Sequence, residues 1–416
     1  MFELILSAAI IGITYSIKSV FVLSKSLGRK RRWLVTSIYT LITGGLFAYF
    51  FITSRDFQEL RENNPALLDF VVGGFFTLMV TCLVMGLFHL VEDIIWVMKA
   101  IVRSVRGHSK VAEDLGGSKM TRSTFISKLG LGAGALALGS FVWGFTKGKF
   151  GWRIVEEELA FENLPKSFDG TKIIQISDLH LGSFREQFEP LKEAIQLINE
   201  LEPDYIFFTG DLVNTYFWEA DPWVPVFQEL KAKKGKFSIL GNHDYGYYGD
   251  TSDEEQAACR EGVIQRNKDM GFTPLINEHA ILEENGERIG LLGVENWGES
   301  HWFPKVGDVG KAREGMPEVP FTMLLSHDPS HWDLHVQGKE DIDLTFSGHT
   351  HGAQMGLRIP GVLELSPAAI MFKRWAGLYK EGKQHLYINR GMGYLMMPGR
   401  VGMPPEITFM TLKSKA

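Results

Sequence analysis

Aspartate, histidine and asparagine residues recur in short clusters through the second half of this 416-residue chain, in types and spacings that suit metal binding. The clusters are Asp-Leu-His at 178–180, Gly-Asp at 210–211, Gly-Asn-His-Asp at 241–244, the single residue His327, and Gly-His-Thr-His at 348–351. Carboxylates, imidazoles and one amide oxygen form a ligand set that suits Mn, Fe or Zn. Seven or eight such ligands are too many for one ion, but they suit two divalent ions that share a carboxylate.

The spacing within two of the clusters favours a common direction. On an extended stretch, residues i and i+2 point to the same side, and Asp178/His180 and His349/His351 both have this spacing. We therefore expect each pair to face one pocket. The neighbouring glycines would allow a close and unusual approach of the backbone.

Each cluster taken alone has a plain structural interpretation. A Gly-Asp step after a strand is usually a turn, and a single histidine is more often a satisfied core or surface residue. Five elements in a fixed order, each at the end of a predicted strand, favour one shared site instead. The remaining histidines lack this context and are interpreted as structural or surface residues: His89, His108, His279, His301, His331, His335 and His385.

The elements that must position these clusters alternate between strands and helices from Trp152 onward. The predicted strands cover residues 172–177, 204–209, 236–240, 288–294, 322–326 and 343–346, and the predicted helices cover 188–201 and 253–270. This alternation predicts an α/β sheet. Open α/β sheets carry their sites at the carboxyl ends of strands, which is where every cluster lies.

Composition divides the chain into two parts. With 45% hydrophobic residues, 22% charged residues and two cysteines, it is not a disordered chain, a disulfide scaffold or a Cys-rich zinc module. Residues 1–150 carry a net charge of +8, whereas residues 151–416 carry −14. We expect two domains with this boundary, and the acidic second part argues against nucleic acid as its partner.

Four apolar runs in the first part approach the roughly 20 residues that a helix needs to cross a bilayer. We expect transmembrane helices at about residues 4–23, 33–52, 70–91 and 125–146. Buried core helices are the alternative, but four such runs exceed what a soluble domain of this length usually carries. Basic residues dominate the first and third loops, which predicts that these loops are cytoplasmic. Four crossings would then place the second domain outside the cytoplasm.

Two features of the first part allow a functional and a plain interpretation. His89, Glu92 and Asp93 could mark an ion path, but we expect the two acidic residues to lie where the third helix leaves the membrane. The segment 121–126 resembles a twin-arginine export signal but has only one of the two arginines. It is interpreted as the start of the fourth span.

From roughly residue 152 to the C-terminus, the chain resembles the calcineurin-like metallophosphoesterase superfamily. The resemblance lies in the order of its motifs, which is Asp-x-His, Gly-Asp, Gly-Asn-His-Asp, His and Gly-His-x-His. Three further segments resemble its branch of membrane-associated bacterial phosphoesterases of the YkuE and YaeI type. These are Gly-His-Thr-His-Gly-Ala-Gln at 348–354, Asn-Arg-Gly-Met-Gly at 389–393 and Pro-Pro-Glu-Ile at 404–407. Members of that branch are often held by one segment or an export signal, so four spans are a departure.

The resemblance implies a four-layer α/β/β/α sandwich around two metals. It implies a first metal held by Asp178, His180 and His351, a second held by Asn242, His327 and His349, and Asp211 bridging the two. It further implies that His243 is not a ligand but faces the leaving oxygen, oriented by Asp244.

Such a site predicts a metal-dependent phosphoric ester hydrolase, acting on a phosphomonoester or phosphodiester through a metal-bridging hydroxide. His243 would stabilise the transition state or protonate the leaving group. The alternative is a membrane sensor or scaffold whose domain binds metal or ligand without turnover. The complete ligand set favours the hydrolase.

Large apolar residues surround the clusters and leave the substrate open between a lipid phosphoester and any other phosphoester. Aromatic side chains are favoured at membrane interfaces, but the same residues could line an ordinary core or a lid. They are Tyr216, Phe217, Trp218, Trp223, Tyr245, Tyr247, Tyr248, Trp297, Trp302 and Phe303, with Met396 and Met397 near the C-terminus.

Overall fold

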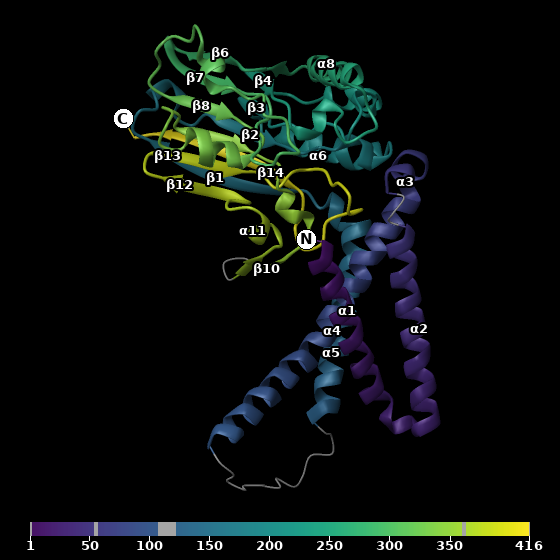
Figure 1. The fold of residues 1–416 in the computed structure, drawn as a ribbon. Helices are drawn as coiled ribbons and strands as arrows, with labels where there is room; N and C mark the ends of the chain where they lie inside the picture. The colour runs from purple at the N-terminus through teal and green to yellow at the C-terminus, as the bar shows by residue number, and fades with distance from the viewer. Residues whose placement is uncertain (1, 54–56, 107–121, 360–362, 416) are drawn as a thin grey trace. The chain divides into compact units, whose positions relative to one another are not determined.

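The structure is a computed structural model that describes residues 2–53, 57–106, 122–359 and 363–415 (Figure 1). The chain divides into two compact units, Met1–Trp143 and Gly144–Ala416. The first unit is helical and is called the helical unit below. The second contains the strands and is called the α/β unit.

The helical unit contains α1 (Phe2–Leu23), α2 (Arg29–Thr53), α3 (Phe57–Asn63), α4 (Pro65–Arg106) and most of α5 (Arg122–Thr146). Among the described residues, α1, α2, α4 and α5 are the helices long and apolar enough to cross a membrane, in agreement with the four expected spans. The helix α3 was not expected. The helix α4 is 42 residues long and continues past Glu92 and Asp93 to Arg106, so the third helix itself is longer than the expected span 70–91.

The direction of the helices follows from their contacts. Helices α1 and α4 run parallel, since Gly12 lies against Leu83 and Lys18, further along α1, binds Asp93 further along α4. A Cβ on Gly12 would lie 2.9 Å from the Leu83 backbone nitrogen, so the glycine permits this close contact.

Helices α2 and α5 run in the opposite direction. On α2, Phe50 lies against Gly74 near the start of α4, whereas Tyr39 lies near Cys82 further along it. On α5, the hydroxyl of Ser127 lies against His89 of α4, and contacts later in α5 are made with earlier turns of α4. The order therefore alternates as expected for a bundle that crosses a membrane four times.

Lys18, His89, Glu92 and Asp93 have partners within the unit. Lys18 Nζ lies 2.7 and 2.8 Å from the two carboxylate oxygens of Asp93. His89 is fully buried, with Nε2 2.8 Å from Ser127 Oγ and Nδ1 3.2 Å from Glu92. These contacts give the three residues a structural explanation. Four charged residues between the expected spans, Arg55, Asp56, Lys110 and Lys119, lie outside the described residues, as do His108 and Thr121.

Two six-stranded sheets form the α/β unit. The first has the order β1 (Arg153–Phe161), β14 (Glu406–Ser414), β2 (Lys172–Ile176), β3 (Tyr205–Phe208), β4 (Gly235–Ser238) and β5 (Thr273–Pro274). The second has the order β12 (Gly377–Glu381), β13 (Gln384–Ile388), β9 (Leu344–Ser347), β8 (Thr322–Leu325), β7 (Glu287–Gly293) and β6 (Glu278–Glu284).

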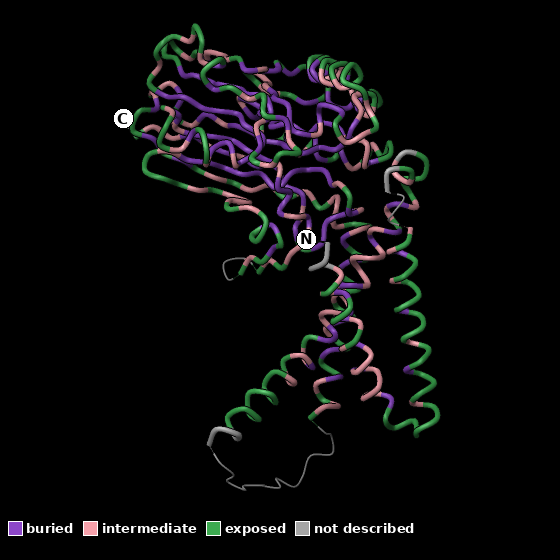
Figure 2. Tube along the Cα trace, viewed as in Figure 1, coloured by how far each residue is buried: buried purple, intermediate pink, exposed green. Residues whose placement is uncertain are grey.

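The layers of the α/β unit follow from which side chains of each strand face the helices and which face the other sheet. Along β3, Ile206 and Phe208 pack toward the helices, whereas Tyr205 and Phe207 pack against the second sheet. Both faces of the strand are therefore buried, which explains its continuous apolar run. Helices α6 (Phe188–Glu200), α7 (Val224–Phe227) and α8 (Asp253–Asp269) cover the first sheet. Helix α9 (Val309–Arg313) and the π-helix Trp332–Val336, which follows α10 (Pro329–His331), cover the second. The expected four-layer α/β/β/α sandwich is confirmed, and Figure 2 shows its strands largely buried.

Pairings between distant parts of the chain were not predicted. The first strand of the unit, β1, pairs in parallel with the last, β14, with Arg153 opposite Glu406. A separate two-stranded hairpin, β10 (Leu357–Ile359) and β11 (Leu363–Leu365), joins neither sheet, and a short helix α11 (Ala368–Met371) follows it.

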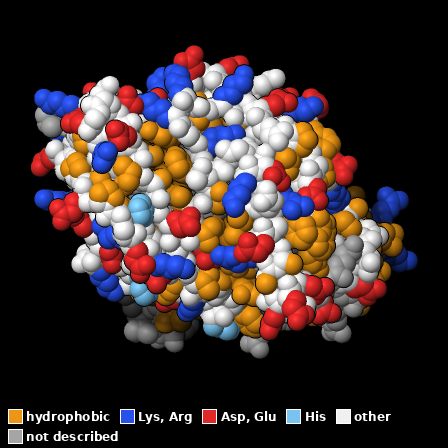
Figure 3. All heavy atoms as spheres, turned by 90° about the horizontal axis from the view of Figure 1, so that it is seen from above, with side chains coloured by type: hydrophobic (Ala, Val, Ile, Leu, Met, Phe, Trp, Pro, Cys, Tyr) orange, Lys and Arg blue, Asp and Glu red, His pale blue; other side chains and the backbone are white. Residues whose placement is uncertain are grey.

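On the face seen in Figure 3, acidic and basic side chains are interspersed among hydrophobic ones.

Candidate metal centre

The predicted site residues all follow strands at the centre of the two sheets. Asp178 and His180 follow β2, Asp211 follows β3, and Asn242 follows β4. From the second sheet, His327 follows β8, and His349 and His351 follow β9. The structure brings these seven side chains together, and they form two groups.

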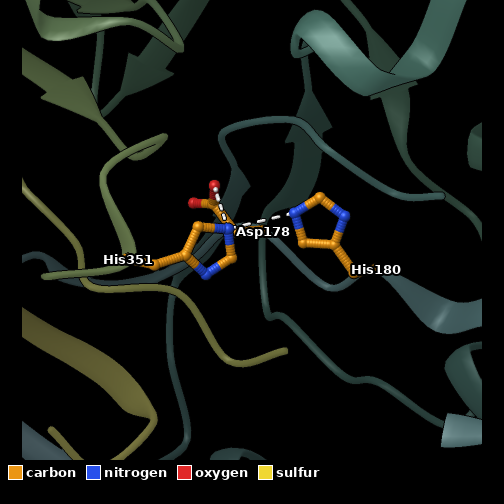
Figure 4. Close-up of side chains that lie close together, drawn as sticks. All are labelled: Asp178, His180 and His351. Carbon is orange, nitrogen blue, oxygen red and sulfur yellow. Dashed lines mark hydrogen bonds and ion pairs between the residues drawn. The ribbon is translucent and has the colours of Figure 1, made fainter. Parts of the chain in front are cut away.

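The first group consists of Asp178, His180 and His351 (Figure 4). The Nε2 atom of His351 lies 3.3 Å from Asp178 Oδ1 and 3.0 Å from His180 Nε2. Donor atoms around one ion are about 3–3.5 Å apart when the bonds to the ion are about 2.0–2.2 Å. The three residues fit a single cation.

The second group consists of Asp211, His327 and His349. Asn242 belongs with it, because its Oδ1 atom lies 3.2 Å from His327 Nε2 and 2.8 Å from His349 Nδ1. The amide is oriented by Tyr248, whose hydroxyl accepts a hydrogen bond of 2.7 Å from Asn242 Nδ2. Its oxygen therefore faces the group.

The carboxylate of Asp211 lies between the two groups. Its Oδ2 atom is 3.6 Å from His180 Nε2 in the first group and 3.2 Å from His327 Nε2 in the second. Its other oxygen, Oδ1, accepts a hydrogen bond of 2.8 Å from the backbone N–H of His243. One oxygen is thus fixed by the chain while the other faces both groups.

The backbone at five of these residues is left-handed. The φ angles are 52° at Asp178, 46° at His180, 59° at Asp211, 73° at His349 and 52° at His351. Positive φ is uncommon outside glycine, costs about 1–3 kcal/mol each, and clusters at functional sites. The premise of extended stretches was therefore wrong. Asp178 and His180 share one group, but His349 and His351 divide between the two, because tight turns and not strand alternation aim them.

The expected role of the glycines is confirmed at two positions. Gly210 has φ of 92°, and a Cβ there would lie 2.4 Å from the Gly241 nitrogen. A Cβ on Gly348 would lie 2.0 Å from Ser177 Oγ and 2.3 Å from the Asp178 carboxylate. A larger residue at either place would push the ligand-bearing loops apart.

Burial gives the site its electrostatic character. Desolvation raises the pKa of Asp178 to about 6 and lowers the pKa of His180 to about 3. Although burial opposes it, the Asp211 carboxylate raises the pKa of His327 to about 10. Bound cations would stabilise the carboxylate charges and accept imidazole lone pairs. The donor set therefore fits divalent metals.

The surroundings of His243 differ from the expectation in one respect. Its Nδ1 atom lies 2.7 Å from the Asn214 carbonyl oxygen, and its ring stacks on Tyr248 at 4.0 Å between centroids. Asp244 was expected to orient this ring, but its carboxylate accepts hydrogen bonds from four backbone N–H groups at 2.8–3.3 Å. Those N–H groups belong to Gly241, Asp211, Leu212 and Val213. Asp244 thus shapes the Asp211 loop, and the Asn214 carbonyl orients the ring.

Two further residues at the site were not singled out from the sequence. Arg400 is 1% exposed, and its Nη2 atom lies 3.2 Å from His351 Nδ1. Asp328 Oδ2 lies 3.6 Å from His349 Nε2. The His-Asp step at 327–328 was a visible signal for Asp328, whereas nothing local marks Arg400.

Some of the aromatic residues noted around the clusters lie in the core, and others lie on the surface. Trp223 and Tyr245 are buried, as the plain interpretation predicted, whereas Trp302 is 74% exposed. At the metal groups, the ring of His349 contacts Phe303 and Phe372, at 5.0 and 5.6 Å between centroids. Apolar rings therefore flank the second group.

Comparison with known proteins agrees with this geometry. Residues 2–149 match the family described as "Probable Calcineurin-like phosphoesterase, transmembrane domain", and residues 171–353 match "Calcineurin-like phosphoesterase". The chain belongs to the calcineurin-like phosphoesterases. The resemblance seen in the sequence is confirmed, and the four apolar helices lie within the residues that match the transmembrane family.

Relatives of this phosphoesterase match it over different parts of their own length. The "Uncharacterized metallophosphoesterase YkuE" of Bacillus subtilis is 31% identical over 309 residues, which cover 71% of this chain and 99% of that protein. The "Transmembrane protein with metallophosphoesterase domain" of Danio rerio is 30% identical over 268 residues. That match covers 63% of this chain and 57% of the Danio protein, so the chain spans little more than half of that relative. The protein is a multi-pass membrane protein with a metallophosphoesterase domain.

Proposed function

We propose that the protein is a membrane-anchored hydrolase of a phosphomonoester or phosphodiester that uses two divalent metals, drawn from Mn, Fe and Zn. The observation that carries this proposal is the Asp211 carboxylate, whose Oδ2 atom faces His180 and His327 from the two groups. A carboxylate placed in this way suits a shared ligand. A single-ion site would not need the second set of donors.

The proposed ligands are Asp178, His180 and His351 for one ion, Asn242, His327 and His349 for the other, and Asp211 for both. When bound, such a pair of ions supplies an activated water and neutralises the charge of the phosphoryl oxygens. The chain's part is to hold the donors in place, and the left-handed turns and the Asp244 hydrogen bonds do so before any substrate arrives.

His243 is the proposed proton donor to the leaving oxygen. The contact between Nδ1 and the Asn214 carbonyl places a proton on Nδ1, since a carbonyl oxygen only accepts. Proton transfer is thereby assigned to Nε2. The stack on Tyr248 keeps the ring in this orientation.

For the substrate we propose a lipid phosphoester, with the catalytic domain outside the cytoplasm. Phe303 and Phe372, which both contact His349, would suit an apolar chain next to the phosphate. The membrane anchor keeps the domain close to lipid. The basic first and third loops support the orientation.

The test uses the purified full-length protein. Removal of metals with a chelator should abolish hydrolysis of chromogenic aryl phosphomonoesters and phosphodiesters, and Mn, Fe or Zn should restore it. A lipid phosphoester in mixed micelles should be cleaved faster than a soluble ester with the same headgroup. Binding of two metals without turnover on any of these esters would instead support a sensor or scaffold. Lipid and phospho-metabolite profiles of cells lacking the protein would then identify the substrate.

A further inference from the structure

The β10–β11 hairpin has the reverse of the usual alternation between buried apolar and exposed polar residues. In its register Leu357 pairs with Leu365 and Ile359 with Leu363. All four side chains are exposed, at 40–54%. A hairpin on the surface of a soluble domain normally turns such a face toward the core.

The polar face of the hairpin is the one held by the domain. Arg358 and Glu364 are paired across the two strands, and Glu364 also accepts a hydrogen bond of 2.9 Å from Arg390. Arg390 is itself 6% exposed. The orientation of the apolar face is thus fixed by contacts on its opposite side.

Helix α11 adds to the same surface. Ile370 is 92% exposed and Met371 is 54% exposed, and Figure 1 shows α11 and β10 projecting on one side of the α/β unit. Among the described residues 144–415, thirteen large hydrophobic side chains are exposed, and six of them lie in this segment. We call these six the apolar face: Leu357, Ile359, Leu363, Leu365, Ile370 and Met371.

This segment is anchored at the point where the last membrane helix ends. The backbone carbonyl of Gly144, near the end of α5, accepts a hydrogen bond from Arg400. The next residue, Val401, accepts a hydrogen bond of 2.8 Å from Gly356, which immediately precedes β10. The start of the hairpin at Gly356 is therefore linked, through the backbone of Arg400 and Val401, to Gly144 at the end of α5.

The linker after α5 does not loosen this connection. Phe150 packs against Phe184, and Trp152 donates a hydrogen bond of 3.0 Å to the carbonyl of Pro190. The chain that leaves the membrane is thus packed onto the domain from its first residues.

The same segment also contacts the metal loops. Ser366 donates a hydrogen bond to the Gly352 carbonyl, and Thr350 donates one to the Trp375 carbonyl. Phe372, directly after α11, lies against the His349 ring. A surface that contacts lipid here would adjoin the second group of donors.

We propose that the apolar face inserts into the leaflet of the bilayer next to the α/β unit, as a second membrane contact in addition to the four helices. The partner is lipid because the face carries no charge and its root is tied to the end of a transmembrane helix. This proposal rests on the membrane anchor and not on turnover, so it stands or fails separately from the proposed hydrolysis.

The experiment places an environment-sensitive fluorophore on the full-length protein in vesicles of phosphatidylcholine and phosphatidylglycerol. The labelled variants are Leu363→Cys and Ile370→Cys, and the control is Ala258→Cys, which is exposed on α8 at the opposite side of the unit (Figure 1). Both native cysteines, Cys82 and Cys259, are buried, so the introduced thiol takes the label. Since Ile370 is 92% exposed, its replacement removes little packing.

Lipids with brominated acyl chains should reduce the emission at both face positions by about half or more, because interfacial elements reach about 5–10 Å into the boundary between headgroups and chains. The control should not change. Equal emission with and without bromine at positions 363 and 370 would overturn the proposal. Emission shielded from water but insensitive to bromine would also overturn it, and would indicate a second protein surface as the occupant.

Discussion

The helical unit and the α/β unit both bring titratable residues into contact with polar partners, but they do so in different ways. In the helical unit the contacts are pairwise, as in the Lys18–Asp93 pair and the His89–Ser127 contact. In the α/β unit seven donors converge, and Asp211 alone faces two groups. Pairwise contacts between side chains are explained by stabilisation of the helices, whereas more metal-ligating side chains than such pairs require indicates a metal site.

Backbone conformation separates the two units in the same way. Among the described residues of the helical unit, Gly28 alone has positive φ, at 77°. In the α/β unit five of the seven proposed ligands do. Strain of about 1–3 kcal/mol per residue persists only where the surrounding structure enforces it. Changes in the α/β site should therefore affect chemistry, and changes in the helical unit should affect stability.

The largest expected effect is the all-or-none result of a topology experiment. The positive loops predict that α5 ends outside the cytoplasm. A reporter that is active only in the cytoplasm, fused after Ala416, should be silent, and the same reporter fused within the first loop at residues 24–28 should be active. A bright signal from the C-terminal fusion would reverse the orientation and place the phosphoesterase chemistry inside the cell.

The next effect concerns the shared ligand. Asp211→Asn removes the charge that faces both groups and should abolish measurable turnover, because both ions would lose their shared ligand. Metal content should fall below two ions per chain, as measured by elemental analysis. The control is Asp204→Asn, since that carboxylate accepts a backbone hydrogen bond outside the site. Two bound metals with full activity in Asp211→Asn would refute its bridging role.

The residues that converge in the α/β unit could be picked out from the sequence because their types and their order along the chain are local signals. Strands 204–209 and 322–326 could be read from apolar runs, and each is followed directly by its ligand. The geometry of the ligands could not be read, because left-handed turns at Asp178 and His349 depend on close approach to other loops. The pairing of β1 with β14 and the role of Arg400 join residues far apart in the chain, and no local pattern encodes them.

A smaller effect separates catalysis from metal binding. His243→Ala should keep both metals and the fold but reduce turnover by about 10²–10⁴-fold, the usual contribution of a general acid. The loss should be larger for alkyl phosphodiesters than for activated aryl esters, whose leaving oxygen needs no proton. His279→Ala is a matched control, since that ring also contacts a backbone carbonyl, at 2.9 Å from Ala312, but lies outside the site.

Two results would change the role assigned to His243. Loss of one metal in the alanine variant would make it a ligand, despite the contact of its Nδ1 atom with Asn214. An equal loss of rate on both classes of ester would indicate stabilisation of transition-state charge and not proton donation. Rates on both substrates together with metal analysis distinguish these outcomes.

The smallest effect is expected for the ion pair of the helical unit. Lys18→Met leaves Asp93 unpaired, and Asp93→Asn leaves Lys18 unpaired, whereas the double variant removes both charges. Polar contacts between membrane helices contribute about 0.6 kcal/mol on average and at most about 1.7 kcal/mol. Because the side chains are 37% and 44% exposed, we expect a coupling energy within that range.

The measurement that checks this is SDS-induced unfolding of the full-length protein in mixed micelles, combined with turnover of an aryl phosphodiester. The double variant should be closer to wild-type stability than either single variant, because no charge is left without its partner. Turnover should stay near the wild-type rate in all three, since pairing in the helical unit serves assembly. A loss of turnover as large as that of His243→Ala, with both metals retained, would show that the helical unit controls the site and would remove the distinction between the two units.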